Sequence, residues 1–260
     1  MPLTLSSFVY NSVLAQSQEL SREDIRALDK AYLKKLNLPI YDGEIKITNA
    51  KNIFSSSNDK YYISQIHRFL KMHEEQVKNG YVNEQQTRAQ ELIQFKKSSI
   101  YQFQKYQNDF SMKATFLRKN SNELIMAYDF HGVPSTFIDE NIGYAPYGAF
   151  KETKNGDEVN GWDGAIQFFT KKDIGTCEYK EHSIKISHGG VELIKELVSY
   201  EINHKPTIIL VQGTNASGYL YQVSWYDDNF SRQLNCASAS FSQKTKEDVI
   251  ELARNIENAQ

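Results

Sequence analysis

Asp129 and His131, near the middle of the chain, have the residue types and spacing for proton transfer. They lie two positions apart at the end of an alternating segment, so we expect both side chains on one strand face, where a carboxylate can orient an imidazole. The chain has no Gly-x-Ser-x-Gly motif that would present a nucleophilic serine. The pair fits either a hydrolase, with His131 as base and Asp129 orienting it, or a structural hydrogen bond.

Residues 131–164 combine glycines, aromatic side chains and carboxylates without a helical or strand period. Long loops of this kind are often functional, because aromatic faces can stack on a sugar or hold a peptide. The candidate binding residues are Tyr144, Tyr147, Phe150 and Trp162. A surface loop whose rings fold back onto a sheet explains the same composition, so both interpretations stay open.

Metal and cofactor signatures are weak throughout the sequence. Carboxylates and amides at positions 155, 157, 160 and 163 lack the alternating ligands and terminal glutamate of an EF-hand, although Asp163 can accept hydrogen bonds. His182 and His204 have no evident partners, and the glycines at 213 and 218 fit a hairpin turn better than a phosphate loop. We therefore expect no metal and no cofactor.

The two cysteines, Cys177 and Cys236, both lie in the half of the chain that is rich in predicted strands. They fit either a structural disulfide, which is the favoured alternative, or two buried thiols, and a disulfide closing about 60 residues would stabilise the fold by about 4 kcal/mol. Because structural disulfides persist in oxidising compartments, we expect a secreted or periplasmic protein. Residues 3–15 lack the basic start of a signal peptide, so we expect an export signal to have been removed ahead of Met1.

Helical spacing dominates residues 1–108, which we expect to form the first of two regions. Helices are predicted at 21–38, 59–79 and 83–107, and the last two form a long antiparallel helical hairpin over about 59–107. The hairpin either packs on the rest of the protein or pairs with a second copy, which makes a homodimer possible.

Alternating apolar residues dominate from position 110, so we expect a second region at 109–260 that contains the long loop 131–164. A β-hairpin is expected at 110–130, strands at 176–186, 207–211, 219–226 and 234–241, and helices at 190–202 and 245–256. Short connections favour antiparallel pairing. The predicted class is α+β, with an N-terminal helical region and a C-terminal antiparallel β-meander covered by helices.

Charge and hydropathy exclude some classes of function. The 30 basic and 32 acidic residues leave a net charge of −2, so we expect no nucleic-acid partner, and no apolar run is long enough to span a membrane. Without a nucleophile or metal motif, an enzyme is the less favoured class. The sequence best fits an exported, non-enzymatic protein, such as a bacterial secreted effector, that recognises a protein or glycan. A hydrolase with a site near the 131–164 loop is the alternative.

Overall fold

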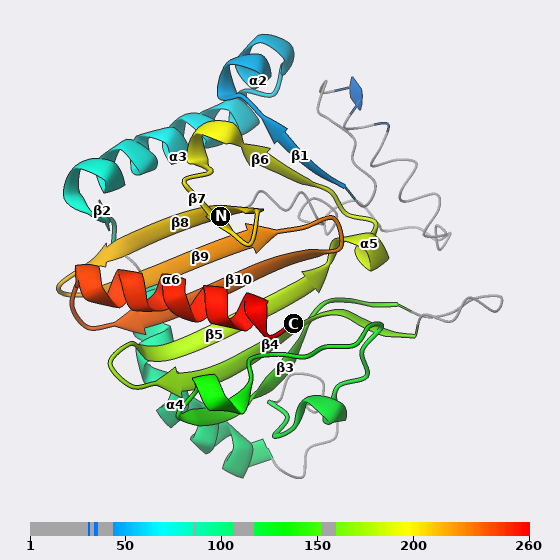
Figure 1. The fold of residues 1–260 in the computed structure, drawn as a ribbon, viewed down its shortest axis with the longest axis vertical. Coiled ribbons are helices and arrows are strands. Elements are labelled where there is room, and N and C mark those ends of the chain that lie inside the picture. Colours follow the sequence, from blue (N-terminus) through cyan, green and yellow to red (C-terminus); the bar gives the residue numbers. More distant parts are fainter. Residues whose placement is uncertain (1–30, 32–33, 36–43, 86, 107–116, 152–159) are drawn as a thin grey trace, which may run out of the picture.

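The computed structural model describes residues 31, 34–35, 44–85, 87–106, 117–151 and 160–260 (Figure 1). Its centre is a mainly antiparallel sheet of eight strands in the order β2-β8-β9-β10-β5-β4-β3, with β7 paired to β8. A separate two-stranded parallel sheet joins β1 and β6. Most of the described fold is therefore built on β-strands.

The strands are β1 (Ile45–Thr48), β2 (Val82–Asn83), β3 (Glu140–Lys151), β4 (Gly161–Lys171), β5 (Gly175–Ser183), β6 (Val191–Ile194), β7 (Tyr200–Ile202), β8 (Lys205–Thr214), β9 (Gly218–Tyr226) and β10 (Phe230–Ser238). The α-helices of the described residues are α2 (Ala50–Ser56), α3 (Lys60–Asn79), α4 (Thr87–Tyr106), α5 (Ile184–Ser187) and α6 (Gln243–Asn258).

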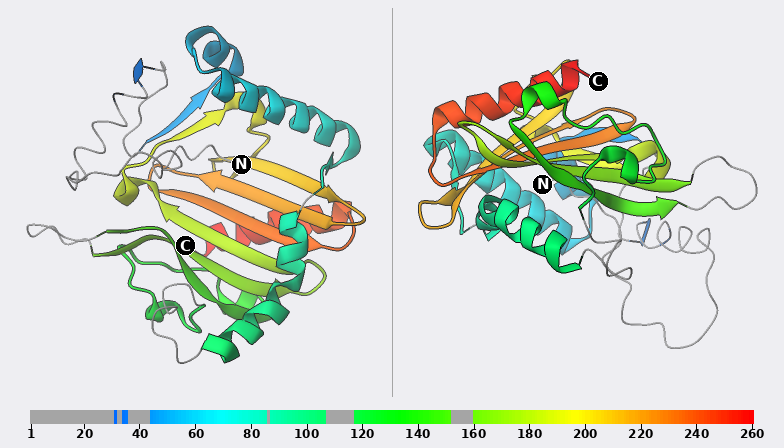
Figure 2. Two further views of the ribbon diagram at one scale, coloured as in Figure 1. Left: turned by 180° about the vertical axis from the view of Figure 1, so that it is seen from behind. Right: turned by 90° about the horizontal axis from the view of Figure 1, so that it is seen from below.

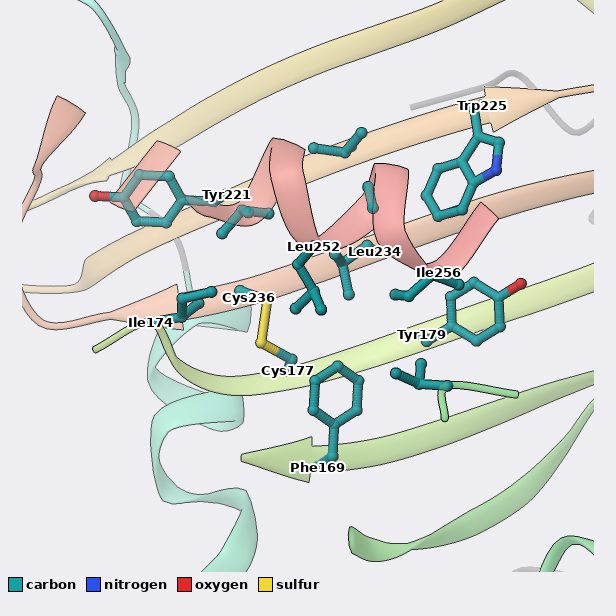
Figure 3. Packing of buried hydrophobic residues seen from close by; sticks show 14 of the residues in the cluster. Phe169, Ile174, Cys177, Tyr179, Tyr221, Trp225, Leu234, Cys236, Leu252 and Ile256 are labelled. Atoms are coloured by element: carbon teal, nitrogen blue, oxygen red, sulfur yellow. A yellow bond between two sulfur atoms is a disulfide. The ribbon is translucent and has the colours of Figure 1, made fainter. Parts of the chain in front are cut away.

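One face of the large sheet, the α6 face, is covered by the C-terminal helix (Figure 1). Ser242 caps α6 by accepting a hydrogen bond from the Thr245 amide, and Val249, Leu252 and Ile256 pack against the sheet. The alternating residues of β5, β9 and β10 supply the other side of this core (Figure 3). The sheet members of the cluster include Cys177, Tyr179, Tyr221, Val223, Trp225, Leu234 and Cys236.

The opposite face, the α4 face, is covered at one end by α4, which packs on β5, β9 and β10 (Figure 2). Ala89 and Leu92 contact a small apolar cluster formed by Phe168, Leu220 and Ala237. Further residues of this face are polar, because the positions that alternate with the α6-face core carry hydrogen-bonding and charged side chains. They include Glu178, Lys180, His182, Gln222, Ser224, Gln233 and Asn235.

Helix α3 closes an edge of the sheet through a side chain. The Gln76 amide donates to the Ile209 carbonyl oxygen at 2.8 Å and its oxygen accepts from the Val211 amide. These two backbone groups lie on β8 between its pairing with β7 and its pairing with β2. Gln76, which is 7% exposed, therefore takes the place of a missing strand residue.

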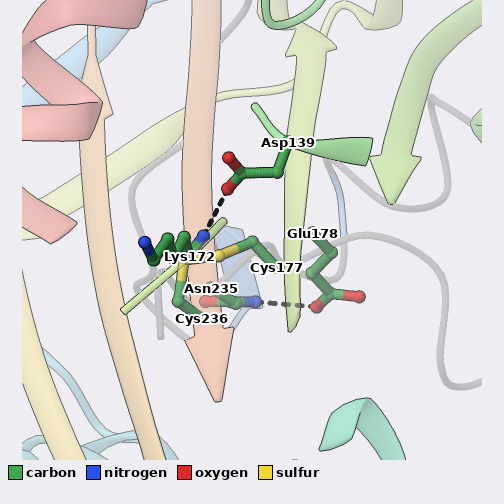
Figure 4. Close-up of a disulfide and its surroundings, with 6 residues drawn as sticks. All are labelled: Asp139, Lys172, Cys177, Glu178, Asn235 and Cys236. Carbon is green, nitrogen blue, oxygen red and sulfur yellow. Dashed lines mark hydrogen bonds between the residues drawn. A yellow bond between two sulfur atoms is a disulfide. The ribbon is translucent and has the colours of Figure 1, made fainter. Parts of the chain in front are cut away.

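Cys177 and Cys236 form a disulfide, which confirms the predicted pairing (Figure 4). The two residues lie directly opposite each other on β5 and β10, and both are fully buried. On the other face of the same strands, the Asn235 amide donates to Glu178 at 2.8 Å. The disulfide thus joins two strands whose pairing is also held by a polar contact.

A charged cluster fastens the end of α6 to the sheet. The Trp225 indole donates to Glu257 at 2.7 Å, and Lys205 also pairs with Glu257. Arg232, only 6% exposed, pairs with Glu181 at 3.0 Å and Asp227 at 2.7 Å. Because the buried carboxylates have cationic or hydrogen-bonding partners, burial does not leave them as isolated charges.

The predicted fold class is wrong. The fold is dominated by strands with a small helical part, and α3 and α4 do not form a helical hairpin. The link between them contains β2, which pairs in parallel with Gln212 and Gly213, so the chain joins the sheet instead of turning back on itself. Helix α3 then packs near β2 and β8, whereas α4 packs on the central strands β5, β9 and β10. Most of the predicted helix at 21–38 lies outside the described residues.

Two further predicted elements differ from the structure. Residues 190–202, expected as a helix, contain β6, a 3-10 turn and β7, because Val191 and Leu193 alternate into a cluster with Tyr226 and pair with β1. In the hairpin expected at 110–130, residues 110–116 lie outside the described part, and residues 117–130 contain isolated bridges at Arg118 and Met126 in place of strands.

Much of the segment 131–164, expected as a loop, forms β3 and the start of β4. Register shifts occur between Asn141 and Gly143 and between Tyr147 and Phe150. These β-bulges, together with Pro146 inside the strand, hide the two-residue period that a regular strand would show. Pro146 is tolerated because β3 is at the edge of the sheet.

Candidate functional site

The far end of the α4 face carries a row of residues from three neighbouring strands. Tyr147 of β3 lies opposite Gly164 of β4, which lies opposite His182 of β5. A side chain at 164 would begin only 3.0 Å from the Tyr147 ring and 3.1 Å from the His182 ring. The glycine therefore lets the two rings meet above it, edge to face, with their centroids 5.7 Å apart.

A second aromatic pair lies next to this row. Phe150 is the register partner of Trp162, and their rings meet edge to face with centroids 5.5 Å apart. Trp162 lies two residues from Gly164 on β4, so its side chain leaves the same face. Tyr147, Phe150, Trp162 and His182 together form what we call the aromatic corner.

A buried carboxylate shapes the strand beneath the aromatic corner. Asp163 is 1% exposed and accepts a hydrogen bond from the Ala149 amide at 2.7 Å. Its other partners are Lys151, with Nζ at 3.1 Å, and His182, with Nε2 at 3.3 Å. A Cβ at Gly148, where φ is 79°, would lie 2.0 Å from an Asp163 oxygen. The bulge of β3 is thus built around this carboxylate.

Asp163 is held in its charged form by these contacts. Burial by itself would raise the pKa of Asp163, but hydrogen bonds from His182 and from the Ala149 amide outweigh it, so that the pKa is lowered from its ordinary value. Burial raises the pKa of Tyr147, and the negative charges of Asp163 and Glu178 raise it further. The corner therefore presents a neutral phenol, held beside a fixed and neutralised carboxylate.

A second buried carboxylate lies further along β5 on the same face. Glu178 is fully buried and accepts a hydrogen bond from the Asn235 amide (Figure 4). It is also paired with Lys180 at 3.0 Å and with Arg88 of α4. Burial would raise the pKa of Glu178, but the charges of Lys180 and Arg88 lower it more. This contact links α4 to the sheet and leaves Glu178 as a structural anion.

The structure brings together three of the four predicted binding residues. Tyr147, Phe150 and Trp162 share the aromatic corner, whereas Tyr144 faces the opposite side. Tyr144 packs against the main core and meets Phe130 edge to face, with the ring centroids 6.3 Å apart. We therefore assign Tyr144 to the core side of β3. Tyr147, which is 37% exposed, is the most accessible large apolar residue of the corner.

Asp129 and His131 lie at the surface and outside the strands. The side chains are 90% and 57% exposed, and His131 Nε2 is 3.5 Å from an Asp129 carboxylate oxygen. The other ring nitrogen of His131 is 3.1 Å from the Asp129 carbonyl oxygen. Within the described residues, His131 has no hydrogen bond beyond those to Asp129. Their catalytic role stays a prediction.

Sequence reasoning missed His182 and Lys151 as partners of Asp163. The alternation of β5 places His182 on the same face as Lys180, and this much can be read from the sequence. The contact with Asp163 cannot be read from the sequence, because it depends on the register in which β4 pairs with β5. No group of three or more His, Cys, Asp or Glu side chains within the described residues is placed to hold a metal ion.

Comparison with protein-family models, with curated proteins and with solved structures finds no match for this chain. No helix in the described part of the chain is long and apolar enough to cross a membrane.

Proposed function

We propose that this is an exported, non-enzymatic binding protein that recognises a protein or glycan partner through the aromatic corner. The observation that carries the proposal is that two edge-to-face pairs, Tyr147 with His182 and Phe150 with Trp162, lie next to each other on one sheet face, where Tyr147 is exposed. Aromatic side chains of this kind supply most of the binding energy at many interfaces, at little cost in conformational entropy.

The rigidity of the corner supports the same proposal. Asp163 is bound to the β3 backbone, to Lys151 and to His182, so the strands that carry the aromatic rings are held before a partner arrives. Preorganised groups bind more tightly because less freedom is lost on association. The disulfide supports export, since such bonds persist in oxidising compartments.

The hydrolase alternative has less support. Its site depends on Asp129 and His131, which are exposed, and no serine or cysteine within the described residues is hydrogen-bonded to the imidazole. A general base requires a group to activate within hydrogen-bond reach. A binding role therefore explains the aromatic corner without the additional nucleophile that a hydrolase would need.

The test measures binding of the purified protein and its variants to a glycan array and to surface proteins from its source. We expect Tyr147→Ala to weaken binding by at least about thirtyfold, because an aromatic hot spot contributes about 2 kcal/mol or more. Tyr61→Ala is the matched control, since Tyr61 is 71% exposed and lies on α3. His131→Ala should change binding little.

The reverse ranking, with His131→Ala abolishing a measured activity and Tyr147→Ala harmless, would contradict the proposal. Trp162→Phe provides a second variant that keeps an aromatic ring at a position packed on the chain around Met126. It should reduce affinity less than Tyr147→Ala and leave thermal unfolding nearly unchanged.

A further inference from the structure

A cavity of about 390 Å³ lies beside the small sheet of β1 and β6, apart from the aromatic corner. It is formed by β1, β6, α2 and the first turn of α3, which Figure 1 shows together at one end. Its size falls within the range of about 300–1,000 Å³ that is usual for small-molecule sites. It shares no lining residue with the corner.

The two-stranded sheet supplies one wall of the cavity. Lys46 lies opposite Glu192 in the parallel register of β1 and β6, and Thr48 lies two residues further along the same face of β1. Asn52 of α2 lines the cavity from the helical side, and Tyr62 of α3 donates a hydrogen bond to Glu192. The site thus joins residues 46–62, which are close in sequence, to Glu192 of the distant strand β6.

Apolar packing holds the elements around the cavity in place. Ile53 and Tyr62 belong to an apolar cluster with Ile66 and Ile194, and both are 4% exposed. The first amide of α2 donates to the Glu196 carboxylate at 3.1 Å, which ties this helix to the segment after β6. The cavity is therefore part of a packed unit.

The lining is chemically mixed. Glu192 supplies acceptors, Lys46 supplies donors, and Asn52 supplies both, while Ile53 offers an aliphatic surface. The Thr48 hydroxyl oxygen is buried and makes no hydrogen bond with any described residue. Because buried polar atoms are usually satisfied, this hydroxyl indicates a place for a ligand's polar group.

The charges of the lining narrow the class of ligand. One carboxylate and one ammonium cancel formally, and a single lysine gives no cluster of cations for a phosphate or nucleotide. Hydroxyl groups both donate and accept hydrogen bonds, so a polyhydroxylated molecule can satisfy this mixture of partners. An aliphatic side chain can meanwhile contact the C–H groups of a sugar ring.

We propose that this cavity binds a small, neutral, polyhydroxylated molecule of about the size of a monosaccharide. The site is separate from the aromatic corner, so this proposal does not depend on the proposed function of the corner. Glu192 and Asn52 accept and donate to the ligand hydroxyls, and Thr48 gains a hydrogen-bond partner when the site is filled.

The experiment titrates the isotope-labelled protein, separately, with glucose, galactose, mannose and N-acetylglucosamine, and follows backbone amides by NMR. We expect saturable shifts at β1, α2 and Glu192 with at least one sugar, at a Kd of about 1 mM or tighter. Asn52→Ala should weaken that binding by about tenfold, since it removes a hydrogen-bonding group. Asn58→Ala is the matched control, because Asn58 is exposed and does not line the cavity.

Glu192→Gln keeps the shape of the wall and an acceptor for Tyr62, so it should weaken sugar binding without lowering the unfolding temperature. Absence of saturable shifts with all four sugars would overturn the proposal. Saturable shifts of the same amides with glycine or inorganic phosphate, but with none of the sugars, would show that the ligand is not a neutral polyhydroxylated molecule. Shifts confined to Tyr147 and Trp162 would also reject this site while supporting binding at the aromatic corner.

Discussion

Replacing Gln76 with alanine should destabilise the protein by about 2–6 kcal/mol, because two buried backbone groups would lose the side-chain hydrogen-bond partner that they have among the described residues, at about 1–3 kcal/mol each. The amide of Val211 and the carbonyl of Ile209 both bind Gln76, which is 7% exposed. Water reaching the edge of β8 would lower the cost toward the smaller figure.

Urea unfolding followed by tryptophan fluorescence is a suitable assay, since Trp225 is fully buried in the main core. Hydrogen exchange should also show faster exchange of the Val211 amide in the variant, because its acceptor has been removed. Gln90→Ala is the matched control. Gln90 also donates from a helix to a backbone carbonyl, that of Ala216, but the contact is exposed. We expect it to change stability by less than about 0.5 kcal/mol.

Gln76→Glu tests the same contact through pH. A carboxylate can accept from the Val211 amide but cannot donate to the Ile209 carbonyl, so the protonated form fits better and the pKa of the new side chain should be raised. The variant should therefore gain stability relative to the wild type as pH falls from 7 toward 5. A loss below about 0.5 kcal/mol for Gln76→Ala, with unchanged exchange at Val211, would refute the reasoning.

Two further predictions concern the disulfide and the free energy of unfolding at acidic pH. Reducing the bond between Cys177 and Cys236, which are 59 positions apart, should lower the free energy of unfolding by about 4 kcal/mol, measured by urea denaturation with and without reductant; equal midpoints would contradict this. The pKa of Asp227 is lowered because hydrogen bonds from Lys205 and Arg232 outweigh the effect of burial. Its contribution to stability is full above the unfolded pKa of about 4 and is lost as pH falls below it, so Asp227→Asn should flatten the fall in stability between about pH 5 and 2.

The locally encoded parts of the fold were predictable. Asp59 accepts hydrogen bonds from the amides of Tyr61 and Tyr62, and Gly80 adopts a left-handed conformation at the other end of α3, so this helix begins and ends as its sequence indicates. The strands of the C-terminal half show the two-residue period. Their alternation places Cys177 and Cys236 on the same buried face.

Other parts were not predictable because they depend on partners distant in sequence. Residues 191, 194 and 198 have the spacing of a helix face, yet β6 is a strand because β1 pairs with it. The two residues of β2 are too few to show a period, and their pairing with β8 separates α3 from α4. Short segments of this kind take the structure that their neighbours in space impose.

The candidate site shows the same limit. Composition selected Tyr144, Tyr147, Phe150 and Trp162 alike as candidates, whereas the register of β3 directs Tyr144 to the other face. The contact between Asp163 and His182 links two strands. No local pattern in either strand specifies it, because it depends on the register of the strands and on the β3 bulge, where a Cβ at Gly148 would lie 2.0 Å from an Asp163 oxygen.

The position of α6 after the last strand has a consequence for biosynthesis. Because α6 follows β10 in the chain, the strands are synthesised before the helix that covers their apolar face, and Trp225 and its neighbours stay exposed to water until residues 243–258 pack on them. Both cysteines precede α6 in the chain, so the disulfide can form before this helix has packed on the sheet.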